Sequence, residues 1–105
     1  MSQAASVNAT KKGIDLKGSL VFSTVSNLLS EGNQQLKQHQ AESIQIDLSD
    51  VERVDSAGIA LLLEWKRLCD KQDKTYKIVG AQSQIASLIT TNKMQGLLGL
   101  AYSRL

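Results

Sequence analysis

Residues 46–63 read IDLSDVERVDSAGIALLL, and this stretch decides the fold more than any other part of the chain. It begins inside a run, residues 43–48, in which polar and apolar residues alternate, as they do in a strand with one buried face. A short polar turn is expected over residues 49–53, followed by a helix that starts after Asp55 and ends near Asp73. Four residues stand directly before the apolar part of that helix: Asp55, Ser56, Ala57 and Gly58.

Upstream of this stretch the pattern predicts two strands and a helix. Residues 14–20 alternate like a strand, and residues 4–9 form a weaker strand candidate joined to it by a hairpin turn at Lys11-Lys12-Gly13. Ser23 or Thr24 then caps a helix. The apolar positions at helical spacing in that helix are Val25, Leu28, Leu29 and Leu36, and Gly32 on the same stripe permits a close packing contact.

Downstream, the sequence predicts one more strand and one more helix. The strand covers residues 76–80, and the helix begins at Ser83 or Gln84 and carries Ile85, Leu88 and Ile89. Residues 96–105 are expected to add a short helix and a last strand. The order β-β-α-β-α-β-α indicates an α/β domain with one mixed sheet and helices covering one face. The half-polar strands argue that the other face is not fully buried.

The composition indicates one globular domain over residues 1–105. The chain has a mass of 11.4 kDa, and a hydrophobic fraction of 42% is enough to build a core. The net charge of +2 is too small and too scattered to predict nucleic acid or an anionic membrane as the main partner. Cys69 has no second cysteine to pair with, residues 1–13 contain no signal peptide, and no apolar run approaches the ~20 residues of a membrane span. We therefore expect a cytoplasmic protein.

A helical wheel divides the helix after Asp55 into two sides. The expected core side holds Gly58, Leu61, Leu62, Trp65, Leu68 and Cys69. The opposite side holds Ser56, Ile59, Leu63, Lys66, Arg67 and Asp70. Two bulky apolar residues on an outward side, close to a helix start, are typical of a docking patch. The alternative is that another helix of the same domain covers Ile59 and Leu63, and the wheel leaves both interpretations open.

Asp55 and Ser56 likewise admit two interpretations. Either side chain can cap the helix by accepting hydrogen bonds from its first free N–H groups, which is worth ~1 kcal/mol, and the helix dipole favours an acid there. A hydroxyl at an exposed helix start is also within reach of a kinase, and a phosphate on Ser56 would carry about −1.5 to −2 charges.

In its order of elements and in this motif, the chain resembles the STAS domain, a family shared by anti-sigma factor antagonists and the cytoplasmic parts of sulfate transporters. In that family a strand ends in a turn bearing Asp-Ser or Asp-Thr, followed by a small residue, a glycine and an aliphatic helix. The likeness in layout covers nearly the whole chain and is most specific in residues 46–49 and 54–63. It implies a STAS-like single domain, a mixed sheet with helices packed mainly on one face.

Within the family, Arg53-Val54-Asp55 followed by residues 58–63 looks most like the MlaB type, the small STAS subunit of the Mla phospholipid-transport ABC system of Gram-negative envelopes. That resemblance implies a protein without catalysis that binds the cytoplasmic ATPase subunit, supports its assembly and activity, and meets the inner membrane only through the complex. The hydroxyl position of the family motif falls on Ser56. The residues expected to contact the ATPase are Asp55, Ser56, Ala57, Ile59, Leu63 and Arg67.

The chain departs from the family pattern in two places. Residues 18–21 carry no acid where family members often do, and since that loop lies near the motif in the fold, contacts made by those acids are not carried over. Ser56 stands where relatives of the MlaB type carry threonine, and serine is what the phosphorylated antagonists use. An anti-sigma factor antagonist switched by phosphorylation of Ser56 therefore remains the alternative.

Other chemistry has little support in the sequence. Asp47, Asp50 and Asp55 have no histidine ligand and no metal-site spacing. His39 lies in a polar run and is expected to be a solvated surface residue, with no plausible Ser or Asp partner for a catalytic triad nearby. There is no phosphate loop or dinucleotide fingerprint. We expect no catalytic residue, no metal and no cofactor.

Overall fold

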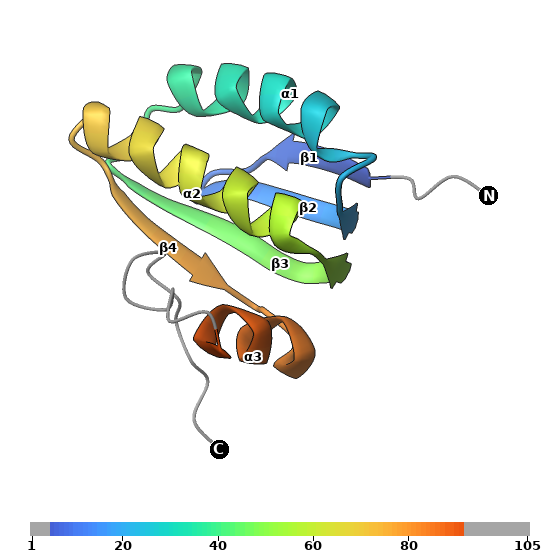
Figure 1. Ribbon diagram of the computed structural model, residues 1–105. Coiled ribbons are helices and arrows are strands. Elements are labelled where there is room, and N and C mark those ends of the chain that lie inside the picture. Colours follow the sequence, from blue (N-terminus) through green and yellow to red (C-terminus); the bar gives the residue numbers. More distant parts are fainter. Residues whose placement is uncertain (1–4, 92–105) are drawn as a thin grey trace.

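The computed structural model describes residues 5–91, which form a four-stranded sheet and three helices (Figure 1). In chain order the elements are β1 (Ala5–Ala9), β2 (Gly13–Leu20), α1 (Val25–Gln38), β3 (Ser43–Val54), α2 (Ser56–Lys71), β4 (Thr75–Val79) and α3 (Ser83–Thr91). The predicted order β-β-α-β-α-β-α is confirmed. The short helix and strand expected over residues 96–105 lie outside the described residues.

The sheet is mixed, with the strands side by side in the order β1-β2-β3-β4. β1 and β2 form the predicted antiparallel hairpin, and β2, β3 and β4 run parallel to one another. Two successive strand–helix–strand connections place α1 and α2 next to each other on one face of the sheet, where both run antiparallel to β2, β3 and β4 (Figure 1). The amino ends of both helices therefore lie at the carboxyl end of β2 and β3.

Most of the core lies between these two helices and the sheet, and Ile85 and Ile89 of α3 belong to the same cluster. Every second residue of a strand contributes its side chain to the core; on β3 these residues are Ile44, Ile46 and Leu48. The hydroxyl of Tyr76 on β4 donates a hydrogen bond of 2.8 Å to the carbonyl oxygen of Leu62 and ties β4 to α2. Burial raises the pKa of Tyr76 well above its usual value, so this hydroxyl remains a donor.

The polar turn predicted over residues 49–53 is wrong, because β3 continues without interruption to Val54. The register between β2 and β3 shifts twice, so β3 holds extra residues that break the strict alternation of faces. Val51 is completely buried although the residues around it are polar. Pairing with the second half of β2 keeps this polar segment extended.

Within residues 5–91, no helix combines the length and the hydropathy that crossing a membrane requires.

Candidate functional site

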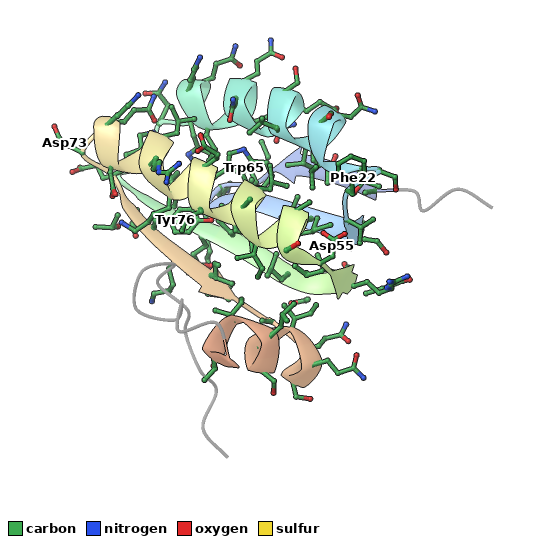
Figure 2. The ribbon with its side chains drawn as sticks, viewed as in Figure 1. Phe22, Asp55, Trp65, Asp73 and Tyr76 are labelled. Atoms are coloured by element: carbon green, nitrogen blue, oxygen red, sulfur yellow. The ribbon has the colours of Figure 1, made fainter. Side chains whose placement is uncertain are left out.

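Asp55 organises the amino end of α2. Its extended backbone (φ −107°, ψ −171°) ends β3 and makes it the N-cap of the helix. One carboxylate oxygen, Oδ1, accepts the N–H of Gly58 at 3.1 Å, and the other, Oδ2, accepts the N–H of Phe22 at 3.0 Å. The capping role predicted for Asp55 is confirmed. The side chain also binds the loop that follows β2, which the sequence did not reveal (Figure 2).

The surroundings of Asp55 stabilise the negative charge of its carboxylate. Burial by itself raises the pKa of this carboxyl. The hydrogen bonds donated by Phe22, Gly58 and Ala57, together with the nearby charge of Arg53, outweigh burial and hold the pKa below its usual value. The carboxylate is therefore ionised at neutral pH and both of its oxygens have backbone partners. Asp55 thus links the start of α2 to the loop that follows β2.

Gly58 explains why the motif needs a glycine. A Cβ at this position would lie 2.1 Å from the carbonyl oxygen of Leu20, far inside contact distance. The first turn of α2 thus sits directly on the end of β2, and the N–H of Asp55 donates to the same Leu20 oxygen at 3.2 Å. The glycine allows the close approach that brings Asp55 to the Phe22 loop.

Ser56 and Ala57 open α2 at the surface. Ser56 is exposed at the first helical position, and Ala57 is partly buried beside it. Arg67 is exposed three turns further along and pairs with Glu64 on the same helix. The structure therefore places Ser56, Ala57 and Arg67 on accessible surface, with Asp55 immediately before them.

The outward placement of Ile59 is wrong. Only 7% of this residue is exposed, and it belongs to the continuous core. Leu63 is partly buried and packs against that core. The wheel assumed that α2 buries a single narrow stripe, but α1 flanks the helix on one side and β4 contacts it as well, so the buried surface is wider. The alternative in which the domain itself covers this side describes Ile59.

An apolar groove lies between the amino-terminal halves of α1 and α2. It has a volume of about 280 Å3. Its lining consists of Phe22, Val25, Ser26, Leu29, Ala57, Ala60, Leu61 and Glu64. Phe22 stands at its edge and is 83% exposed, whereas its neighbour Val21 is buried. The groove includes Ala57, the residue after Ser56, and extends the surface of the motif toward α1.

Sequence reasoning missed the part of this groove that comes from the Phe22 loop. An aromatic residue directly after a strand is expected to be buried in the core. The sequence alone does not show that Val21 is buried while Phe22 is exposed. The one available signal was the acidic cap, since a carboxylate with two oxygens can bind a second loop. Val25 and Leu29 were recognised as helix-face residues, and both are partly buried at the groove.

Other candidate residues have local structural roles. His39 is partly buried and not a solvated surface residue: its Nε2 lies 2.7 Å from the carbonyl oxygen of Thr10, and its Nδ1 accepts the N–H of Ala41 at 3.1 Å. Asp47 accepts the N–H and the hydroxyl of Ser49. Among residues 5–91, no three His, Cys, Asp or Glu side chains gather as metal ligands would.

Comparisons with known proteins are consistent with this geometry. A family model described as "Mlab, STAS domain" matches residues 4–99. The fold is similar to the anti-sigma factor antagonist SpoIIAA in its unphosphorylated form, with a TM-score of 0.74 and 12% identity over 96% of this chain and 89% of that one. It is also similar to the Bacillus cell fate determinant SpoIIAA in the phosphorylated form, with a TM-score of 0.68 and 12% identity over 96% and 92%. A search of curated proteins found no match to the sequence.

Proposed function

Because the chain belongs to the STAS domain family, under the description Mlab, we propose that it is a regulatory subunit of an ABC phospholipid transporter of the Mla type. In this role it binds the cytoplasmic ATPase subunit and supports its assembly and activity, and so contributes to the lipid asymmetry of the outer membrane. It carries out no catalysis itself. It is cytoplasmic and reaches the inner membrane only through the transporter complex.

The observation that carries the proposal is the exposed start of α2 at the family motif. Ser56, Ala57 and Ala60 present small side chains on the first turns, and no charged residue occurs in the helix before Glu64. A surface of small uncharged residues allows a partner to approach closely without leaving a buried charge unpaired. Leu63 and Arg67 continue this surface along the helix, and Ile59 supports it from beneath.

Ser56→Glu tests the proposal directly. The added carboxylate would stand in the contact without a partner, so the affinity for the co-expressed ATPase subunit should fall by more than about tenfold. Ser56 is exposed, and an acid in the first turn is compatible with the helix dipole, so the melting temperature of the variant alone should change little. Leu63→Asp is a less selective variant, because Leu63 packs partly against the core and its loss also lowers stability.

The control for this experiment is Lys77→Ala, an exposed position on β4 away from the motif, which should bind as the wild type does. Pull-down and titration calorimetry with the purified ATPase subunit give the affinities. Wild-type protein that fails to bind the ATPase, or a Ser56→Glu variant that binds it normally, would contradict the proposal.

The alternative function is that of an anti-sigma factor antagonist. It is favoured by one observation, the exposed hydroxyl of Ser56 at the first position of α2, directly after the ionised Asp55. A phosphate there would add negative charge beside that carboxylate and switch the surface off. Incubation with an anti-sigma kinase should then add one phosphate to the wild type and none to Ser56→Ala. Absence of labelling would exclude this role for that kinase.

A further inference from the structure

The groove between α1 and α2 combines an aromatic rim with a floor of small residues. Within the part of the chain that the structure describes, Phe22 is the one large hydrophobic side chain that stands exposed. The backbone that carries the ring is held in place, because the N–H of Phe22 donates a hydrogen bond to Asp55 Oδ2. Burying such a ring in a contact removes apolar surface from water, which favours binding. Phe22 thus presents an exposed aromatic ring, on an anchored backbone, to the groove.

We propose that this groove receives one amphipathic helix of the protein partner, lying antiparallel to α1 and α2, with a bulky aliphatic side chain seated between Phe22, Leu29 and Leu61. The inference rests on the proposed function, in which the partner is the ATPase subunit. It adds the chemistry and the direction of the segment that docks. Asp55 also acts as a positioning residue, because its Oδ2 accepts the backbone N–H of Phe22.

The spacing of the lining residues fits a third helix. Ala57 and Ala60 lie three residues apart on the same side of α2, and Val25 and Leu29 lie one turn apart on α1. Small residues at a helix contact let the two axes come close, toward the lower end of the usual 8–10 Å. Apolar side chains of an incoming helix repeat at the same three- and four-residue intervals, which is how helices dock in apolar grooves.

The charges at the two ends of the groove give the direction. Glu64 is the one ionised residue among those that line it, and its ion pair with Arg67 is mostly exposed and easily exchanged. At the other end, α1 begins with no acid in its first turn and no side-chain cap, since the Thr24 hydroxyl donates to the Ser19 carbonyl oxygen. The positive amino end of α1 is therefore uncompensated.

Asp55 does not cancel the positive charge at the amino end of α1. Its carboxylate compensates the amino end of α2, accepts backbone N–H groups with both oxygens, and lies near the positive charge of Arg53. A partner helix antiparallel to α1 and α2 brings its negative carboxyl end to the uncompensated end of α1. Its positive amino end then faces Glu64. The parallel orientation would place like charges together at both ends.

The size of the groove argues against a second copy of this chain as the occupant. Eight residues line it, whereas a stable interface uses about 20–30 residues on each side. In a two-fold dimer this patch would have to meet the same patch of the second copy. A partner that lies in the groove and also covers Ser56 and Arg67 has a continuous surface to bind.

The first test is Phe22→Ala, measured by titration of the purified ATPase subunit. Affinity should fall about tenfold or more, as expected for an anchor residue, with an unchanged melting temperature because the ring is exposed. Ala60→Phe, which fills the floor at an exposed position, should give the same loss. Asn27→Ala, an exposed α1 residue outside the groove, is the matched control and should stay within about twofold.

The outcomes separate the groove from the proposed function. If Phe22→Ala and Ala60→Phe bind like the wild type while Ser56→Glu does not, the groove proposal is overturned and the ATPase partner stands. If the wild type does not bind the ATPase, both are overturned.

Photocrosslinking tests the helix and its direction. A photoreactive phenylalanine derivative is placed at position 22 in one sample and at position 67 in another, in the complex co-expressed with the ATPase subunit. Both should crosslink to one helix of the ATPase, and position 22 should reach residues nearer the carboxyl end of that helix. Crosslinks to a loop, to a second copy of this chain, or in the reverse order would each contradict the proposal.

Discussion

Asp55 joins two loops that are 33 residues apart in the sequence. A capping residue ordinarily satisfies N–H groups of its own helix, and Asp55 does so at Gly58. Its second oxygen does the equivalent for Phe22. One side chain therefore determines both where α2 begins and where the exposed aromatic ring is held.

We predict that Asp55→Asn destabilises the protein by about 1 kcal/mol at neutral pH. An amide can cap Gly58 through its oxygen, but it then turns its NH2 group toward the N–H of Phe22, where two donors oppose each other. Asp55→Ala removes both contacts and should cost more, up to about 2 kcal/mol. Urea unfolding measures the difference. Equal stability of wild type and Asp55→Asn at pH 7 would show that the hydrogen bonds of the Asp55 carboxylate do not contribute to the free energy of unfolding.

The same residue predicts a pH dependence with a definite sign. The pKa of Asp55 is lower in the folded than in the unfolded protein, so between the two values the folded state binds fewer protons. The stabilisation is therefore fully present above the unfolded pKa, near pH 4, and is lost as the pH falls through the folded value. The gap between wild type and Asp55→Asn should shrink from pH 7 to pH 3. A constant gap would contradict this assignment.

At the level of elements, the contact between α1 and α2 depends on one glycine and one tryptophan. A Cβ added to Gly32 would lie 2.2 Å from Cζ2 of the Trp65 ring. Trp65 is fully buried in the core, where a ring displaced by an added side chain would disturb its neighbours. The sequence predicted a close contact at Gly32, and the structure supplies its partner. The distance between the two helices, and with it the width of the groove, follows from this pair.

We predict that Gly32→Ala destabilises the protein although alanine is the better helix former. The gain in propensity is about 1 kcal/mol, and overpacking a tight core costs about 1–3 kcal/mol. The Trp65→Phe background removes the ring atoms that clash. It sacrifices no hydrogen bond, because Trp65 Nε1 has no partner within residues 5–91. In that background Gly32→Ala should be neutral or stabilising.

A double-mutant cycle by thermal or urea unfolding measures this coupling. Ser30→Ala, exposed on α1, controls for helix propensity alone. The same destabilisation by Gly32→Ala in both backgrounds would mean that the ring is not the obstacle.

At the level of the whole molecule, the fold gathers its candidate site at one end. The carboxyl ends of the parallel strands β2 and β3 meet the amino ends of α1 and α2 (Figure 1). The motif, the Phe22 loop and the groove all lie there. Open sheets of this kind commonly bind their ligands outside the carboxyl ends of the strands. Cys69 lies near the other end of α2, inside the core.

Cys69 reports on the stability of the entire domain. Its side chain is completely buried, and burial raises the pKa of the thiol, so the reactive thiolate is scarce even where a reagent could reach it. We predict that native protein resists thiol reagents and that labelling in urea follows the global unfolding curve. Rapid labelling without denaturant would show that α2 opens locally.

The sequence by itself determined the order of the elements, the cap at Asp55, the buried positions of Trp65 and Cys69, and the close contact at Gly32. Each of these depends on local chemistry: alternation, helical spacing, a carboxylate before a free helix start, and a residue without a side chain. It also placed Ser56, Ala57 and Arg67 at the surface, because the first turn and the polar side of a helix are set by the helical repeat alone.

Only the tertiary structure decided the burial of Ile59, the extension of β3 through residues 49–54, and the exposure of Phe22. A helical wheel assumes a single buried stripe. Whether a second side of α2 is also buried depends on which elements the topology places beside it. Residues 49–54 are extended because the shifted register of β2 pairs with them, whereas in their own composition only Val51 and Val54 favour a strand. Phe22 is exposed, and its backbone is bound by Asp55, a contact between residues that are distant in the sequence and adjacent only once the sheet has formed.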